Sequence, residues 1–376
     1  MKYLLVFLTA GAVSMLATPG VKRLAIKVGA VDIPNDRKVH SEPTPLLGGV
    51  AMYLALLAGL GVAMLIPSFR ELFRTSSEPG GILAGASIAL VLGVIDDTRG
   101  LGATSKLAGQ MVAAGALILA GVQVFFFWFP KIGIISLSTD LSSLLTVIWT
   151  LGMMNAVNLA DGLDGLAAGV TAIASTAFFV YAFRSAGDIP STAALISAIT
   201  AGACIGFLRH NFNPARIFMG DSGSTLLGLL LASATITGVG RTTEPQFQDF
   251  AGYVVPVLLP FVVLAIPIAD ASLAILRRVR GRRPVFHPDK QHIHHWLLDM
   301  ARSHRQAVLV MYLWSAMLAG SAIALSFGKG PLARGLGFGL GVAFVLSIVV
   351  LPRLLRSELP WEAPELEPVE PDTPSI

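Results

Sequence analysis

The chain alternates between long apolar stretches and short polar segments along most of its length. Each apolar stretch is close to the roughly 20 residues that a helix needs to cross a bilayer. Because lipid cannot satisfy exposed backbone groups, such stretches are expected to be helical. The pattern predicts an all-α, polytopic integral membrane protein with about eleven transmembrane helices, at residues 2–19, 47–66, 81–96, 107–126, 141–160, 165–183, 191–208, 223–239, 251–276, 306–327 and 332–351.

Basic residues are distributed unequally between the polar segments. Most of the 27 Lys and Arg residues fall in alternate segments, above all in 20–46 and 277–305. Cytoplasmic loops carry such an excess, so these segments are predicted to lie inside. This places the N-terminus outside and the C-terminus in the cytoplasm. The basic residues after the first apolar stretch also favour a retained span over a cleaved signal peptide.

Composition supports a membrane protein. Of the 376 residues, 54% are hydrophobic and 13% are charged, whereas soluble domains carry about 25% charged residues. The single cysteine, Cys204, excludes an intrachain disulfide and cysteine-based metal sites. Residues 1–352 are predicted to form one transmembrane domain. Residues 353–376, rich in Pro and acidic residues, are predicted to be a disordered cytoplasmic tail.

Acidic and amide side chains gather at the predicted cytoplasmic ends of the spans. In "NAVNLADGLDG" three of them follow at spacings of three residues, which places them on one helix face, and a fourth lies in the turn beyond. A pair of acids ends the third span, and another acid begins the eighth. The residues concerned are Asp96, Asp97, Asn155, Asn158, Asp161, Asp164 and Asp221.

These acids imply a cation. A charge at membrane depth costs at least ~2.5–3.5 kcal/mol, and crowded carboxylates raise one another's pKa. Carboxylate and amide oxygens are natural ligands of hard divalent ions, and Mg²⁺ prefers to share its shell with phosphate. A Mg²⁺ site is therefore predicted, with Mn²⁺ as the alternative. Helix capping explains any single Asp equally well, but it does not explain the whole set on one side.

Three further segments on the same side carry candidate binding residues. In "FNPARIFMGDSGSTLLG" (212–228) the Ser222 and Ser224 hydroxyls could cap a helix whose N-terminus attracts phosphate, and Arg216 could clamp a diphosphate. In "HPDKQHIHHWLLD" (287–299), a basic loop rich in His suits an anionic group better than zinc, because no Cys or H-E-x-x-H motif accompanies it. The rigid loop "DIPNDRKVHSEPTPLLGG" (32–49) adds further cations. Contact with anionic lipid and ordinary positive-inside anchoring are the alternatives. The candidates in the last two loops are His292, His294, His295, Arg37, Lys38 and His40.

These segments, together with "GVIDDTRGLGATSKL" (93–107), resemble the polyprenyl-phosphate N-acetylhexosamine-1-phosphate transferase family. The resemblance covers roughly residues 30–300, and its five motifs occur in the family's order. The form "DKQHIHH" looks like the branch that uses UDP-N-acetylglucosamine. The resemblance implies that a polyprenyl phosphate in a bacterial inner membrane attacks a cytosolic UDP-sugar, which releases UMP. This would be the first membrane step of cell-envelope polysaccharide synthesis.

The resemblance also implies roles for individual residues. Asp221 and Asn158 look like Mg²⁺ ligands, with Asp97 nearer the metal and Asp96 nearer the lipid phosphate. Asp96, Asp97 and Asp221 would be catalytic. Because adjacent helical residues point about 100° apart, Asp96 and Asp97 are expected to differ in role. The remaining candidates would bind substrate: Asp161 and Asp164 the uridine or sugar, and His292, His294 and His295 the sugar and diphosphate. Direct displacement is favoured over a covalent aspartyl intermediate, because a lipid phosphate is already largely ionised near neutral pH.

Other functions remain open at this point. The UDP-MurNAc-pentapeptide transferase of peptidoglycan synthesis belongs to the same family. An ion-coupled transporter also has intramembrane acids, but near the midplane and often in repeated halves. A CDP-alcohol phosphotransferase would need an Arg that "DGLAAG" lacks. No nucleic acid partner is expected. Gly337 and Gly341 form a small face for either a homodimer or internal packing, and the prolines in 251–276 suggest a kinked helix that either borders a lipid groove or simply packs.

Overall fold

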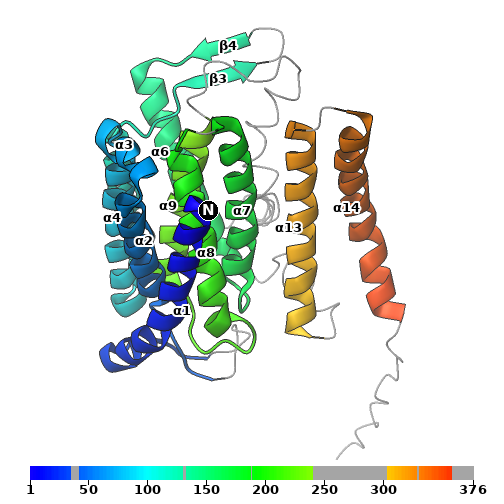
Figure 1. Cartoon of the computed structure of the whole chain (residues 1–376). Helices are drawn as coiled ribbons and strands as arrows, with labels where there is room; N and C mark the ends of the chain where they lie inside the picture. Colours follow the sequence, from blue (N-terminus) through cyan, green and yellow to red (C-terminus); the bar gives the residue numbers. More distant parts are fainter. Residues whose placement is uncertain (35–41, 130–132, 188, 240–302, 328–329, 358–376) are drawn as a thin grey trace, which may run out of the picture.

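The computed structural model describes residues 1–34, 42–129, 133–187, 189–239, 303–327 and 330–357. Helices dominate this part of the chain (Figure 1). Their bounds are α1 Lys2–Val28, α2 Gly48–Leu65, α3 Pro67–Thr75, α4 Glu78–Arg99, α5 Ala103–Leu119, α6 Thr139–Ala160, α7 Leu166–Ala186, α8 Thr192–Asn211, α9 Gly220–Val239, α13 His304–Phe327 and α14 Pro331–Ser357. Every predicted span except the ninth corresponds to one of these helices. The ninth, 251–276, with its prolines, lies outside the described residues.

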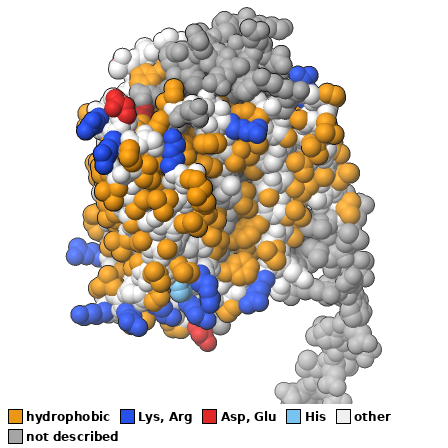
Figure 2. Space-filling model, in the orientation of Figure 1, with side chains coloured by type: hydrophobic (Ala, Val, Ile, Leu, Met, Phe, Trp, Pro, Cys, Tyr) orange, Lys and Arg blue, Asp and Glu red, His pale blue; other side chains and the backbone are white. Residues whose placement is uncertain are grey.

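Eight of the described helices are long and apolar enough to cross a membrane, and α5 is a shorter apolar helix. The molecule is therefore an all-α, multi-pass membrane protein. Figure 2 shows hydrophobic side chains over the flank of the bundle, while Lys and Arg side chains lie mainly near its two ends. This distribution matches a protein whose middle faces hydrocarbon and whose ends face the polar headgroups and water.

Three short elements were not predicted from the sequence. The amphipathic helix α3 begins at Pro67, whose fixed φ suits a first helical position, and buries Phe69 completely. Two antiparallel hairpins join β1 (Val31–Asp32) to β2 (Thr44–Pro45) and β3 (Phe126–Phe129) to β4 (Gly133–Ser136). These elements are too short to give an apolar stretch of spanning length, which explains why hydropathy did not indicate them.

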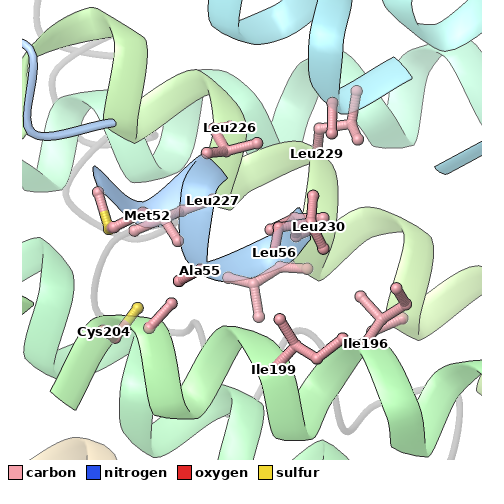
Figure 3. Packing of buried hydrophobic residues seen from close by; sticks show 14 of the residues in the cluster. Met52, Ala55, Leu56, Ile196, Ile199, Cys204, Leu226, Leu227, Leu229 and Leu230 are labelled. Carbon is pink, nitrogen blue, oxygen red and sulfur yellow. The ribbon is translucent and has the colours of Figure 1, made fainter. Parts of the chain in front are cut away.

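Small residues let the helices at the centre approach closely. A Cβ atom on Gly206 of α8 would lie 2.1 Å from the carbonyl oxygen of Gly11 in α1, so only glycine fits this crossing. The core residues labelled in Figure 3, among them Met52 of α2, Ile199 of α8 and Leu230 of α9, come from these helices and interdigitate. As expected from its apolar surroundings, Cys204 is buried there.

The last two described helices stand as a pair beside this bundle, with α13 packed on α7 and α14 packed on α13 (Figure 1). A Cβ atom on Gly337 would meet the Leu325 side chain at 2.7 Å, and the Ser321 hydroxyl donates to the Gly337 carbonyl at 2.8 Å. The small face of Gly337 and Gly341 therefore serves internal packing, which was one of its two predicted uses. Helix α14 continues to Ser357, and the tail beyond it lies outside the described residues.

Candidate active site

The polar site forms at one end of the bundle, where the C-terminal ends of α4 and α6 meet the N-terminal ends of α5 and α9. Helix α4 carries Asp96 and Asp97 in its last turn and stops at Gly100, whose φ of 68° permits a sharp change of direction. The Gly100 amide donates to the Asp96 carbonyl at 2.9 Å, and the Leu101 amide donates to the Asp96 carboxylate at 2.7 Å. The chain then enters α5, which packs on α4.

Lys106 of α5 links two acids from different helices. Its Nζ atom lies 2.8 Å from Asp96 Oδ2 and 2.5 Å from Asp221 Oδ1, and its side chain is 19% exposed. The ammonium group thus offsets the repulsion between carboxylates that come from α4 and α9. From the sequence alone, Lys106 is only one of the two basic residues of the predicted cytoplasmic segment 97–106. A lone Lys shortly after an Asp pair, at the entrance to an apolar helix, was the signal for this role.

Asp97 binds the beginning of α9. Its Oδ1 accepts a hydrogen bond from the Asp221 amide at 2.7 Å, and its Oδ2 accepts one from the Ser222 amide at 3.1 Å. An acid from α4 therefore caps the N-terminus of α9 and favours its helix dipole. The prediction that hydroxyls cap this helix is wrong, because the Ser222 hydroxyl donates to the Met219 carbonyl and Ser224 accepts from Asn158. Asp96 and Asp97 do have different partners, as their helical spacing predicted.

Glycines make the close approach of these helices possible. A Cβ on Gly93 of α4 would lie 2.3 Å from Ser222 Cα, and one on Gly49 of α2 would lie 2.2 Å from the Ser222 carbonyl carbon. Gly220, at a φ of 69°, leaves room for the Asp97 carboxylate. The Gly49 amide also donates to the Met219 carbonyl at 3.1 Å. The start of α9 is therefore enclosed by glycines from two neighbouring helices, which fixes the position of Asp221.

The two asparagines of α6 have different surroundings. The Asn158 amide group contacts Asp221 Oδ1 and donates to Ser224 Oγ at 2.9 Å, so it belongs to the acid cluster. Asn155, about one turn earlier, donates to Gln110 Oε1 at 2.9 Å and to the Leu151 carbonyl at 2.8 Å. Its substrate-binding role stays a prediction, since these contacts do not connect it with the acids.

Asp161 and Asp164 lie in the turn between α6 and α7. Burial raises the pKa of the Asp161 carboxyl well above its usual range, and the charges of Asp221, Asp97 and Asp164 raise that pKa further. Asp164 is instead satisfied by protein groups: its Oδ2 accepts from Asn213 Nδ2 at 2.9 Å and from the Ala215 amide at 3.0 Å. The turn thus carries one acid that lies within the electrostatic influence of the cluster and one that binds the loop between α8 and α9.

The donor set fits the predicted magnesium ion. Of the predicted ligands, Asp221 and Asn158 lie together and can offer hard oxygen donors, and the Lys106 ammonium shows that a cation is accommodated between Asp221 and Asp96. The third, Asp97, uses both carboxylate oxygens to bind α9 amides. In the described part of the chain, no three His, Cys, Asp or Glu side chains are grouped so that they could hold a metal ion. Mg²⁺ held by the residues above would take waters and phosphate oxygens as its further ligands.

Of the other candidates, the structure describes only Arg216. Arg216 is exposed on the loop before α9, and its backbone amide donates to the His210 carbonyl at 2.8 Å. The predicted residues Arg37, Lys38, His40, His292, His294 and His295 lie outside the described residues. The structure therefore brings together Asp96, Asp97, Asn158, Asp161 and Asp221, and adds Lys106 to them.

The sequence is similar to those of known proteins. A model described as glycosyl transferase family 4 matches residues 80–239. A decaprenyl-phosphate N-acetylglucosaminephosphotransferase from Mycolicibacterium smegmatis is 41% identical over 359 residues, covering 93% of this chain and 88% of that protein. A protein named a probable undecaprenyl-phosphate N-acetylglucosaminyl 1-phosphate transferase, from Bacillus subtilis, is 36% identical over 311 residues, covering 83% and 81%.

A phospho-N-acetylmuramoyl-pentapeptide-transferase from Mycolicibacterium smegmatis is also similar, at 31% identity over 368 residues, covering 86% of this chain and 96% of that protein. The matches to the N-acetylglucosamine enzymes are stronger in identity. With the motif order and the convergence of the acids, these similarities show that the chain is a phosphotransferase of glycosyl transferase family 4, the polyprenyl-phosphate N-acetylhexosamine-1-phosphate transferases.

Proposed function

We propose that this enzyme transfers N-acetylglucosamine 1-phosphate from UDP-N-acetylglucosamine to a polyprenyl phosphate, with release of UMP and with a requirement for Mg²⁺. The observation that carries the proposal is the junction of four helix ends at which Lys106 bridges Asp96 and Asp221, and Asn158 contacts Asp221. A site at the end of membrane-spanning helices can take one substrate from the bilayer and the other from water.

The reaction forms one bond and breaks another. An oxygen of the lipid phosphate attacks the sugar-linked phosphorus, and the bond from that phosphorus to the UMP oxygen breaks, so UMP leaves with the electron pair. The attacking phosphate is already largely ionised near neutral pH, so no covalent enzyme intermediate is needed. Positioning and charge stabilisation are then the enzyme's main contributions.

The residues of the cluster divide these tasks. Bound Mg²⁺ would supply charge neutralisation of the diphosphate. Asp221 and Asn158 would hold it, and Asp97 fixes Asp221 through the α9 amides. Lys106 offers a positive charge that phosphate oxygens can share once substrate enters. Asp96 holds Lys106 in place, and metal ligation by Asp97 remains the alternative use of that carboxylate.

The donor is the less settled substrate. The higher identity to N-acetylglucosamine phosphotransferases than to the N-acetylmuramoyl-pentapeptide enzyme supports UDP-N-acetylglucosamine, as does the "DKQHIHH" segment. Purified protein would be incubated with Mg²⁺, decaprenyl or undecaprenyl phosphate and each radiolabelled donor. We expect labelled lipid and an equal amount of UMP from UDP-N-acetylglucosamine alone. Labelled lipid from UDP-MurNAc-pentapeptide alone would assign the other branch, and no product from either would refute the proposal.

The site is further proposed to face the cytoplasm of a bacterial inner membrane. Because Cys204 is buried, single cysteines can report sidedness over a low background. Thr104→Cys lies beside the cluster, and Ser136→Cys lies in β4, at the opposite ends of α5 and α6. In intact cells a membrane-impermeant maleimide should label Ser136→Cys and leave Thr104→Cys unlabelled until the cells are opened. The reverse pattern would place the site outside.

A further inference from the structure

The first turns of α13 hold the two loops that border the active site. The Asp164 amide donates to His304 Nε2 at 3.0 Å, and the Tyr312 hydroxyl donates to the Gly165 carbonyl at 2.6 Å. Arg305 Nε donates to the Asn213 carbonyl at 2.9 Å, on the loop before α9. The first two contacts span 140 and 147 residues of the chain, and the third spans 92. His304, Arg305 and Tyr312 are called the α13 brace below.

The turn that receives two of these contacts has few hydrogen bonds of its own. It connects α6 to α7 through Gly165, which has a φ of 81°. The Asp161 amide donates to the Asn158 carbonyl at 3.2 Å, and the Leu166 amide donates to the Leu163 carbonyl at 2.9 Å. Outside partners therefore contribute much to its conformation: α13 holds the Asp164 amide and the Gly165 carbonyl, and the loop before α9 holds the Asp164 carboxylate.

The packing around the brace is specific. A Cβ on Gly169 of α7 would lie 2.0 Å from Tyr312 Cζ, so the Tyr312 ring lies directly against the α7 backbone. A buried cluster separate from the main core seals this contact, with Leu163, Leu166 and Val170 on one side and Ala307, Val308, Met311 and Trp314 on the other. The α13 brace is therefore a packed contact with its own small core.

From these contacts we infer that His304 and Tyr312 are positioning residues for the nucleotide-sugar, acting through the Asp161–Gly165 turn. The inference rests on the proposed function. His304 accepts the Asp164 amide through Nε2, which requires a ring nitrogen that carries no proton. Loss of either hydrogen bond lets the turn drift and misplaces Asp161 for the donor. The lipid phosphate, which is predicted from the sequence to lie on the Asp96 side of the site, should be affected far less.

The test compares variants that keep or remove the acceptor. His304→Leu removes it at similar volume, whereas His304→Gln can place an amide oxygen near the former Nε2 position. Since one hydrogen bond contributes about 1 kcal/mol, we expect His304→Leu and Tyr312→Phe each to raise the KM for UDP-N-acetylglucosamine about fivefold to tenfold. The KM for polyprenyl phosphate should change less than about twofold. In His304→Gln the KM for UDP-N-acetylglucosamine should return to within about twofold of the wild-type value.

His210→Leu is the matched control. His210 lies at the same end of the molecule, but its ring contacts the Met15 carbonyl at 3.0 Å, away from the turn. It should leave both KM values unchanged. Equal increases in both KM values for His304→Leu, or no increase at all, would overturn the inference. If that variant does not fold, Tyr312→Phe decides by the same criteria. An inactive wild-type enzyme would instead refute the proposed function, so the two failures are distinguishable.

Discussion

Helices α8 and α14 are almost equally apolar, yet the protein places them differently. Their spanning windows have mean hydropathies of 1.5 and 1.6, but 83% of the first window is buried and only 6% of the second. Helix α8 is rich in Ala, Gly, Ser and Thr, which let backbones approach. Helix α14 exposes large side chains such as Phe338 and Val345. Hydropathy thus indicates that a helix crosses the membrane, while side-chain size decides whether it meets protein or lipid.

The two regions also differ in whether they contact the acid cluster. The acid cluster stands at the ends of tightly packed helices, where α9 begins with completely buried Ser222, Ser224 and Thr225. Helix α14 contacts α13 and has no described contact with the cluster. Substitutions in the packed region should therefore affect catalysis strongly, and substitutions on α14 should affect it weakly or not at all.

Asp221→Asn should give the largest difference between the two regions. The substitution keeps the shape of the side chain but removes the charge that pairs with Lys106 and would hold Mg²⁺. We expect kcat for labelled lipid to fall about a hundredfold or more, with the melting temperature nearly unchanged. Phe338→Ala on α14 should retain wild-type kcat. Comparable kcat values for the two variants would remove Asp221 from the reaction and refute the comparison.

Lys106→Met should reduce kcat about tenfold or more, because phosphate loses a fixed positive charge. The same substitution should strengthen the binding of Mg²⁺. Without the ammonium between Asp96 and Asp221, less positive charge opposes a second cation, so half-maximal residual activity should need less Mg²⁺. Activity would be titrated with Mg²⁺ for this variant and for Lys27→Met, an exposed basic residue near the same end of the bundle. A higher Mg²⁺ requirement would show that Lys106 does not compete with the metal.

Gly93→Ala and Gly339→Ala test packing directly with the same chemical change. The new methyl on α4 would lie 2.3 Å from Ser222 Cα, so α9 must shift, whereas the one on α14 meets nothing within 4 Å. We expect Gly93→Ala to cost about 1–3 kcal/mol of stability and to lower kcat severalfold, because Asp221 moves with α9. Thermal unfolding in detergent and the transfer assay measure both. Equal melting temperatures for the two variants would contradict the arrangement of α4 and α9.

The sequence was sufficient for the spans and for much of the site. Apolar length predicted each described spanning helix, and the spacing of Asn158 and Asp161 after an apolar stretch placed them at a helix end. The convergence of Asp97 and Asp221, which are 124 residues apart, was predicted from their common side of the membrane. A common side of the membrane places the two residues near one surface, but it does not identify the groups that they contact.

The partners required the tertiary structure. Asp97 was expected near a metal, and in the structure it caps α9. The cap forms because glycines let α9 approach α4, and a sequence pattern does not tell which glycines lie at such a contact. Lys106 looked like an ordinary basic anchor. The role of α13 was not foreseen either, since His304 and Tyr312 reach Asp164 and Gly165 across about 140 residues of chain. Local patterns cannot specify such contacts between distant segments.

Gly337→Ala should have the smallest effect. The added methyl meets the flexible Leu325 side chain at 2.7 Å and the Ser321 carbonyl at 3.3 Å, so a rotamer change relieves most of the contact. The cost should be about 1 kcal/mol or less, visible as a small decrease in melting temperature. Both KM values should stay at wild type, because α13 contacts the site through its first turns, at His304 and Tyr312, and meets α14 at Ser321 and Leu325 beyond them. A raised donor KM would mean that strain at α14 is transmitted along α13 to the Asp161–Gly165 turn, and α14 would then belong to the active-site scaffold rather than to the lipid-facing periphery.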